Sequence, residues 1–136
     1  FGLLTIKAFA GAAIDGHALA PFDELNVVSG VAWGAKVVVE SWLNFSERDW
    51  ASLDLSWTAA HDATSARMRV GHRMWPSLSL GLEAGFAGNA SSDLGRGGVF
   101  LRGEWASGEL SAAIGLSGTR ASDSSPYGSL SWLIRY

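Results

Sequence analysis

The sequence predicts an all-β protein whose single domain, residues 1–136, forms an eight-stranded antiparallel up-and-down transmembrane β-barrel. Three observations lead to this prediction. Eight segments alternate apolar with polar residues at the period of a β-strand. Nearly all of these segments have the ~9–11 residues that a tilted transmembrane strand needs. The connections alternate between short turns and mostly longer polar loops, which is typical of an outer-membrane barrel with both termini in the periplasm.

The final segment, residues 126–136, alternates most clearly. One face suits lipid and carries Gly128, Leu130, Trp132, Ile134 and Tyr136. The other face suits a barrel interior and carries Ser129, Ser131, Leu133 and Arg135. Because the last strand of a barrel pairs with the first, the chain can end on this strand without leaving an edge. The terminal aromatic residue also resembles the C-terminal signal by which outer-membrane barrels are recognised. The alternative is a central strand of a soluble barrel or sandwich.

The first four strands are expected at residues 3–14, 30–45, 50–60 and 65–74. Alternation divides their side chains between a lipid-facing side and an interior side. The outward residues are Leu4, Ile6, Ala8, Ala10, Ala12, Ile14, Val31, Trp33, Ala35, Val37, Val39, Leu43, Phe45, Leu53, Leu55, Trp57, Ala66, Met68, Val70, His72 and Met74. The inward residues include Lys7, Phe9, Lys36, Glu40, Trp42, Ser52, Asp54, Ser56, Arg67, Arg69, Gly71 and Arg73.

The next three strands are expected at residues 78–87, 96–106 and 109–119. Their outward residues are Leu80, Leu82, Ala84, Phe86, Val99, Leu101, Trp105, Leu110, Ala112, Ile114 and Leu116. Their inward residues are Ser79, Gly81, Glu83, Gly85, Phe100, Arg102, Glu104, Ser111, Ala113, Gly115 and Ser117. The odd-numbered connections are expected to be mostly long outer loops, at residues 15–29, 61–64, 88–95 and 120–125. The even-numbered connections are expected to be tight turns, at residues 46–49, 75–77 and 107–108.

The composition agrees with a barrel and excludes several other classes. No apolar run approaches the ~20 residues of a transmembrane helix. Zero cysteines exclude a disulfide scaffold and thiolate metal sites, and a net charge of -3 without a basic run gives no support for nucleic-acid binding. The 17 glycines suit a narrow, strongly curved barrel, and the seven tryptophans suit a membrane interface. No signal peptide is visible at the start, so we expect a mature chain or a fragment.

Ionisable residues gather on the predicted interior face, where they must pair because an unpaired buried charge costs several kcal/mol. They are Lys7, Lys36, Arg67, Arg69, Arg73, Arg102, Arg135, Glu40, Asp54, Glu83 and Glu104. An ion path or catalytic carboxylates would use such residues. We expect instead a charge ladder that fills the narrow interior.

The three histidines do not form a predicted site. His17 and His61 are expected in different outer loops, and His72 on the lipid face near the inner rim. No two have metal-ligand spacing, and the sequence places no triad partner beside any of them. A barrel deacylase would carry His and Ser two residues apart, which is not seen at His61 or His72. We therefore expect no enzyme activity and no catalytic, metal-binding or cofactor-binding residues.

Aromatic residues and loops offer binding surfaces. Lipid-facing aromatic residues fall at two heights, with Phe45, Trp105, Trp132 and Tyr136 near the inner ends and Trp33, Trp57 and Phe86 further out. Sugar-stacking candidates near the periplasmic mouth are Trp42, Trp50 and Trp75. The outer loops are expected to be acidic, with little but Arg96 and Arg120 opposing Asp15, Asp23, Glu24, Asp62, Asp93 and Asp123. Such a rim could bind divalent cations that bridge to lipopolysaccharide. The first loop, around residues 20–25, is the expected protein contact site.

Several stretches carry a family resemblance. They are KAFAG at residues 7–11, SARMRVGHR at 65–73, LSLGLEAG at 78–85, GN at 88–89, RGGVFLRGEW at 96–105 and SPYGSLSWL at 125–133. Together they resemble the cellulose biosynthesis protein BcsS family of Gram-negative, mainly alphaproteobacterial, cells. The chain departs from the expected pattern at Leu82, where Pro is expected, and at Gly103, where Tyr is expected. The resemblance implies an outer-membrane accessory role beside cellulose secretion and brings no catalytic residues.

The expected function is therefore a non-catalytic structural or accessory barrel of the outer membrane, linked to cellulose or exopolysaccharide secretion. Its expected partners are outer-membrane lipid and lipopolysaccharide, other outer-membrane or periplasmic proteins of a secretion or structural assembly, or a second copy. One alternative is a packing subunit of a larger outer-membrane assembly, for which Ala8, Ala10 and Ala12 offer a small-residue seam. A second alternative is a barrel enzyme that modifies lipid A.

Overall fold

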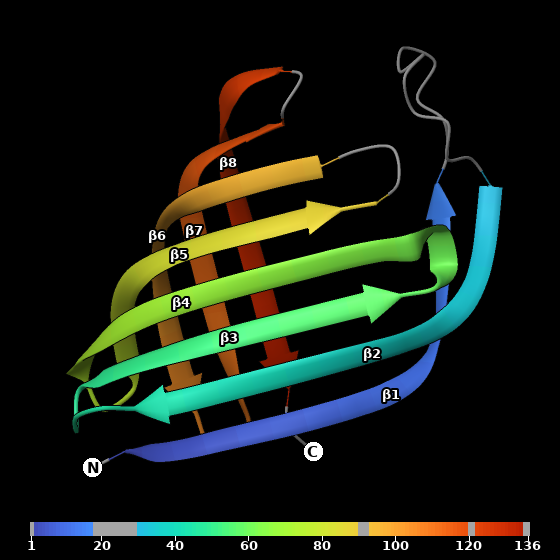
Figure 1. Ribbon diagram of the computed structural model, residues 1–136. Coiled ribbons are helices and arrows are strands. Elements are labelled where there is room, and N and C mark those ends of the chain that lie inside the picture. Colours follow the sequence, from blue (N-terminus) through green and yellow to red (C-terminus); the bar gives the residue numbers. More distant parts are fainter. Residues whose placement is uncertain (1, 18–29, 90–92, 120–121, 135–136) are drawn as a thin grey trace.

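The computed structural model describes residues 2–17, 30–89, 93–119 and 122–134, and it is all-β (Figure 1). Eight antiparallel strands form one sheet in the order β1 to β8, so each strand pairs with its neighbours in the chain. The elements are β1 (Leu3–His17), β2 (Gly30–Asn44), β3 (Asp49–Thr58), the 3₁₀ turn η1 (Ala60–Asp62), β4 (Ala63–Trp75), β5 (Leu78–Gly88), β6 (Asp93–Trp105), β7 (Gly108–Thr119) and β8 (Ser122–Ile134). In the part of the chain described, no helix has the length and apolar character to cross a membrane.

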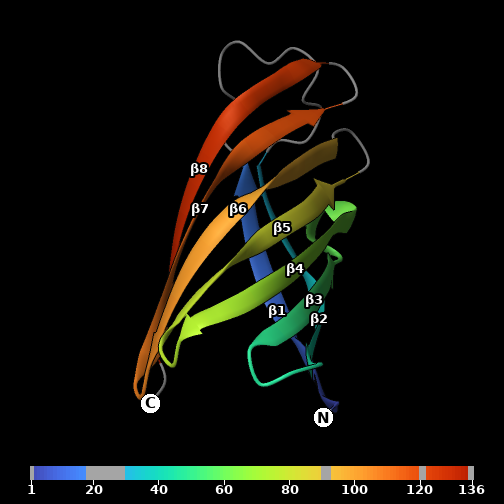
Figure 2. The ribbon, with the colours of Figure 1, turned by 90° about the vertical axis from the view of Figure 1, so that its left-hand side faces the viewer.

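The sheet is strongly curled. From the side it runs from β7 and β8 round to β1 and β2 without a break between neighbours (Figure 2). The start of β1 and the end of β8 lie at the same end of the sheet (Figure 1). We call this the turn end, because the connections at residues 45–48, 76–77 and 106–107 also lie there. Within the described residues β1 pairs with β2 and β8 pairs with β7, so these two strands are the edges of the sheet. The all-β class and the up-and-down order are confirmed, and closure into a barrel stays a prediction.

Most strands are longer than the sequence predicts and several connections are shorter, although β2 ends one residue and β3 two residues before the predicted ends. Strand β1 continues to His17, β6 begins at Asp93 and β8 begins at Ser122. The expected alternation is wrong in part: the first odd-numbered connection, residues 18–29, is long, but those at 59–62, 89–92 and 120–121 are as short as the turns. The reason is that Gly, Ser and Asp act as turn formers only where no partner strand pairs with their backbone. Here the ladders continue through them, as in the β5–β6 pairs Ala87–Leu94 and Gly88–Asp93.

The two faces of the sheet have the predicted residues. The outward side chains are large, apolar and exposed, with exposed fractions of 72% for Trp33, 65% for Leu82 and 74% for Leu130. The concave side buries the rings of Trp50 and Phe100 beside charged groups, among them Glu83 and Arg102. This arrangement is the inverse of a soluble domain, in which apolar residues fill the interior.

Glycines leave room for the buried rings. Gly71 lies directly opposite Trp50 in the β3–β4 ladder, and Gly81 lies opposite Phe100 in the β5–β6 ladder. A Cβ atom on Gly71 would lie 2.5 Å from the Trp50 ring, and one on Gly81 would lie 2.7 Å from the Phe100 ring. The buried positions of the two rings therefore depend on a missing side chain directly opposite each of them.

Candidate functional site

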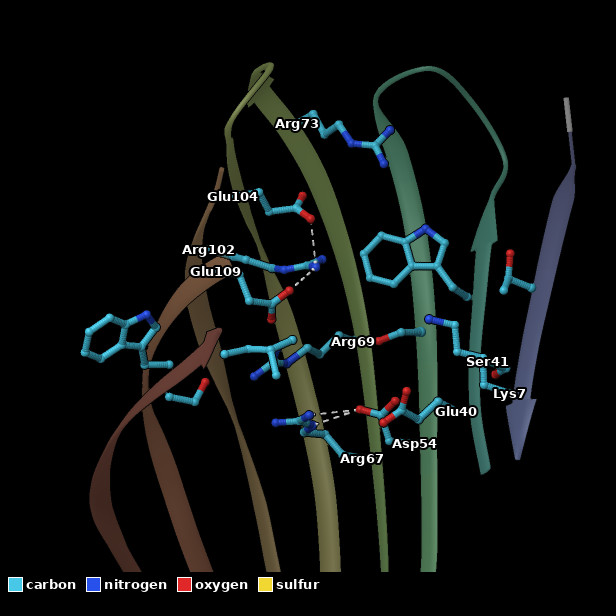
Figure 3. Close-up of a pocket in the computed structure, with 16 residues that line it drawn as sticks. Lys7, Glu40, Ser41, Asp54, Arg67, Arg69, Arg73, Arg102, Glu104 and Glu109 are labelled. Carbon is cyan, nitrogen blue, oxygen red and sulfur yellow. Dashed lines mark hydrogen bonds and ion pairs between the residues drawn. The ribbon is translucent and has the colours of Figure 1, made fainter. Parts of the chain in front are cut away.

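A polar cavity of about 660 Å³ lies on the concave side of the sheet near the turn end. Its wall combines five cationic side chains with four carboxylates (Figure 3). These are Lys7, Arg67, Arg69, Arg73, Arg102, Glu40, Asp54, Glu104 and Glu109. Strand β1 contributes Thr5 and Lys7, and β8 contributes Ser131 and Leu133, so the cavity reaches both edges of the sheet. We call it the turn-end cavity.

Arg102 is the centre of one charge cluster. Its Nη2 donates to Glu104 Oε1 at 2.9 Å and to Glu109 Oε2 at 2.6 Å (Figure 3). The guanidinium carbon also lies 4.7 Å from the Trp42 ring centroid and 5.2 Å from that of Trp50. Two carboxylates and two aromatic rings therefore compensate a cation that is almost fully buried. The sequence analysis predicted Arg102 and Glu104 as interior charges but missed Glu109. Because Glu109 precedes the outward-facing Leu110, strict alternation would have placed its side chain on the interior face.

Two stacked indole rings form the aromatic part of this wall. The rings of Trp42 and Trp50 lie 4.0 Å apart between centroids at 18° between planes. Trp50 is fully buried and donates from Nε1 to Ser79 Oγ at 3.4 Å. Trp42 is half-buried and lines the turn-end cavity. Of the three predicted sugar-stacking candidates, Trp42 alone faces the cavity, because Trp50 lies behind it and Trp75 is exposed at a turn.

A second cluster joins strands that are not neighbours. Arg69 Nε donates to Glu83 Oε2 at 3.1 Å, and the Tyr127 hydroxyl donates to Glu83 Oε1 at 3.0 Å. Tyr127 belongs to β8 whereas Glu83 belongs to β5, so this bond spans the interior from an edge strand. The Arg69 guanidinium also lies 5.0 Å from the Phe100 centroid. The sequence analysis placed Arg69 and Glu83 on the interior face but did not include Tyr127 there. Tyr127 precedes the outward-facing Gly128, so alternation places its side chain on the interior face.

A further ion pair joins Arg67 and Asp54, whose Nη2 and Oδ2 atoms lie 2.9 Å apart (Figure 3). Both side chains line the turn-end cavity and also a second cavity of about 300 Å³ that lies further from the turns. Arg96 lines this second cavity, 5.7 Å from the Tyr127 centroid. The sequence predicts Arg96 both as the first residue of a strand and as a counter-charge of the acidic outer rim. The rim position is wrong, because β6 begins three residues before Arg96 and its side chain lines this cavity.

Other predicted positions are corrected in the same way. Asp15 and His17 lie in β1, Asp93 in β6 and Asp123 in β8, so they do not belong to loops. Asp62, in η1, accepts a hydrogen bond from Trp57 Nε1 at 2.9 Å. Residues 20–25, with Asp23 and Glu24, lie outside the described part of the chain, as do Arg120, Arg135 and Tyr136.

His61 and His72 do not line either cavity. His61 is in η1 with a left-handed backbone, φ 58°. His72 Nδ1 lies 2.7 Å from Asp49 Oδ1 beside the turn between β2 and β3. The Ser46 hydroxyl, which donates to Asp49 Oδ2 at 2.6 Å, and then His72 hold the pKa of the Asp49 carboxyl below its ordinary value. Over the described ranges, no three His, Cys, Asp or Glu side chains are grouped so as to hold a metal ion.

Comparison with known proteins assigns a family. No curated protein and no solved structure matches the chain. The family model described as cellulose biosynthesis protein BcsS matches residues 1–136, the whole length. The resemblance noted in the sequence motifs is thereby confirmed. This chain belongs to the cellulose biosynthesis protein BcsS family.

Proposed function

We propose that this protein is a closed eight-stranded β-barrel of the Gram-negative outer membrane and a non-catalytic accessory component of cellulose secretion. Family membership supports the role in cellulose biosynthesis. The observation that carries the membrane proposal is the inversion of the two faces of the sheet. Large apolar side chains are exposed all round the outward face, while ion pairs are buried on the concave face. Monomeric soluble proteins rarely expose a contiguous apolar patch of more than a few hundred Å².

The positions of the outward aromatic residues support the same placement. Trp33, Trp57 and Phe86 lie near the end of the sheet opposite the turns. At the turn end, the exposed aromatic residues include Phe45, Trp105 and Trp132. Aromatic residues at two heights around an apolar band are typical of outer-membrane barrels, in which they lie at the two lipid–water interfaces. In this orientation the turn end faces the periplasm.

Closure follows from the cost of unpaired backbone groups in lipid. Each unsatisfied N–H or C=O group costs several kcal/mol in the hydrocarbon region, so an open sheet edge does not persist there. Strands β1 and β8 run in opposite directions, because the sheet is antiparallel with an even number of strands. In the bilayer they would pair as a further antiparallel ladder and complete the barrel.

The interior supports a structural role. The most deeply placed charges bond to one another, as in the pairs Arg69–Glu83 and Arg102–Glu109, and so reinforce the wall. Their fixed pairing argues for a plugged barrel over an open channel. The partners in this proposal are lipopolysaccharide and other proteins of the secretion assembly, met through the lipid face and the loops.

The test is membrane fractionation followed by gel electrophoresis of boiled and unboiled samples. We expect the protein in the outer-membrane fraction and a faster-migrating unboiled band, because a closed barrel resists unfolding by detergent. Extraction in mild detergent followed by mass spectrometry would identify the co-purifying partner. A soluble protein with the same mobility before and after boiling would contradict the proposal.

A further inference from the structure

The turn-end cavity has the dimensions of a ligand site. Its volume of about 660 Å³ falls within the range of about 300–1,000 Å³ that small-molecule sites occupy. The charged side chains in its wall come from both sides of the curled sheet and point toward a common space (Figure 3). Nothing in the proposed structural role uses this space.

Trp42 gives the cavity a rigid aromatic surface. Its ring is stacked on the fully buried ring of Trp50, and its Nε1 donates to Asn44 Oδ1 at 3.1 Å. These contacts fix the plane of the indole while part of it remains open to the cavity. A flat, fixed ring of this kind is a surface on which the apolar face of a pyranose can stack.

The charges of the wall suit a neutral ligand that both donates and accepts hydrogen bonds. Five cations and four carboxylates face the cavity, so an ion of either sign meets like charges there. A carboxylate accepts from a hydroxyl group, and a guanidinium donates to one. Arg67, Arg69 and Arg102 are already held by carboxylates, so their geometry is fixed before a ligand arrives. A row of sugar hydroxyls satisfies both kinds of group.

The far wall limits how a chain could lie. The Arg67–Asp54 pair separates the turn-end cavity from the cavity of about 300 Å³ beyond it. A polymer entering at the turn end therefore meets a charged partition. The cavity has room for a short segment or an end of a chain on the turn-end side of this pair.

We propose that the turn-end cavity binds a short segment of a β-linked glucan, with Trp42 as the stacking surface. This inference rests on the proposed function, because the family description supplies the polymer and the cavity supplies the chemistry. In this proposal the accessory protein contacts the polysaccharide directly.

The experiment is titration calorimetry with cellotetraose on protein extracted from membranes in a polyoxyethylene detergent, which carries no sugar headgroup. We expect saturable binding, and an affinity for maltotetraose that is lower by about tenfold because its helical chain stacks poorly on one flat ring. Trp42→Ala should lower the affinity for cellotetraose by about tenfold or more. Trp33→Ala is the matched control on the same strand, since Trp33 faces outward, and should leave the affinity unchanged.

A second variant, Glu40→Gln, tests the site independently if Trp42→Ala does not fold. Glu40→Gln keeps the side-chain shape and removes one charged acceptor from the cavity wall, so the affinity should fall about three- to tenfold. Heat-modifiable protein that does not bind cellotetraose, binds maltotetraose equally well, or is insensitive to both variants would overturn the inference and leave the barrel proposal intact. Protein that is soluble but binds with these variant effects would support the glucan site and contradict the membrane proposal.

Discussion

At the scale of single residues, the interior is built from complementary neighbours. Two large rings each lie opposite a glycine in the adjacent strand, Trp50 opposite Gly71 and Phe100 opposite Gly81. The most deeply buried carboxylate, Glu83, is held by one guanidinium and one phenol. The glycines and Arg69 lie directly across a ladder from their partners, whereas Tyr127 reaches Glu83 from a strand that is not its neighbour.

Adding one methyl group at Gly71 should destabilise the protein. A Cβ atom there would lie 2.5 Å from the Trp50 ring, and the stacked Trp42 leaves that ring little room to move. We expect Gly71→Ala to lower the free energy of unfolding by about 1–3 kcal/mol. Urea unfolding in detergent, followed by the loss of the heat-modifiable band, measures it.

Gly97→Ala is the control for the Gly71 prediction. Gly97 is a strand glycine on the exposed side of β6, and the nearest atom to its Cβ position lies at 3.8 Å. This variant should leave stability within about 0.5 kcal/mol of the parent. Equal losses at the two positions would show that strand propensity, and not the ring contact, is responsible.

Removing Arg69 should cost more than removing Arg67. Arg69→Met leaves the Glu83 side chain, which is 1% exposed, without its cation, and should destabilise by about 3–5 kcal/mol. Arg67→Met breaks a pair whose side chains are 36% and 28% exposed, and should cost about 0–1 kcal/mol. The double variant Arg69→Met with Glu83→Gln should recover most of the loss. A double variant as unstable as Arg69→Met would assign the effect to lost packing.

At the scale of elements, the strands are set by pairing as well as by pattern. The alternation of apolar and polar residues identified all eight strands and the correct face of each. It ended β1 three residues early and started β8 four residues late, since polar loop-like residues can continue a ladder. In the hairpin between β2 and β3, by contrast, side-chain hydrogen bonds determine where the strands stop and the turn begins. Ser46 Oγ accepts from the Asp49 backbone N–H at 2.8 Å and donates to the Asp49 carboxylate.

Removing the Ser46 hydroxyl should raise the pKa of Asp49 toward its ordinary value of 3.8, because this hydrogen bond is the largest cause that lowers it. The pKa is lowered in the folded state, so the carboxylate stabilises the turn above the unfolded pKa. That stabilisation is lost as the pH falls through the folded pKa. Titration of the Asp49 carboxyl by NMR in micelles, comparing Ser46→Ala with Ser46→Thr, checks this. An unchanged Asp49 pKa in Ser46→Ala would assign the shift to His72.

At the scale of the whole molecule, pairing of the two edge strands β1 and β8 would close the sheet into a barrel. Both edges contribute side chains to the turn-end cavity, Thr5 from β1 and Ser131 from β8. The apolar outward face is continuous with both edges, where Ile6 and Leu130 are exposed. A bilayer would cover that face and favour closure, since it penalises unpaired backbone groups at the edges.

Closure can be measured by disulfide trapping, for which a chain with no cysteine gives no background. We expect Thr5→Cys to cross-link with Ser131→Cys or Ser129→Cys in membranes, because paired strands bring Cα atoms within the roughly 4.4–6.8 Å that a disulfide requires. Peptide mass spectrometry after oxidation identifies the bond. Thr5→Cys with Ser111→Cys on β7 is the control that should not cross-link. Failure of both β1–β8 combinations in heat-modifiable protein would contradict pairing in these registers.

The sequence by itself determined the fold class, the number and order of the strands, the face on which each side chain lies and the family. The fold class, the number of strands and the face of each side chain follow from a period of two residues, which is local information. The up-and-down order follows from the mostly hairpin connections, and the family from the sequence motifs. The tertiary structure decided the strand ends, the pairing of Arg102 with Glu109 and of Glu83 with Tyr127, and the position of Trp42 in the cavity wall. These depend on register and curl, which bring together residues far apart in the chain, and no local pattern encodes the distance between them.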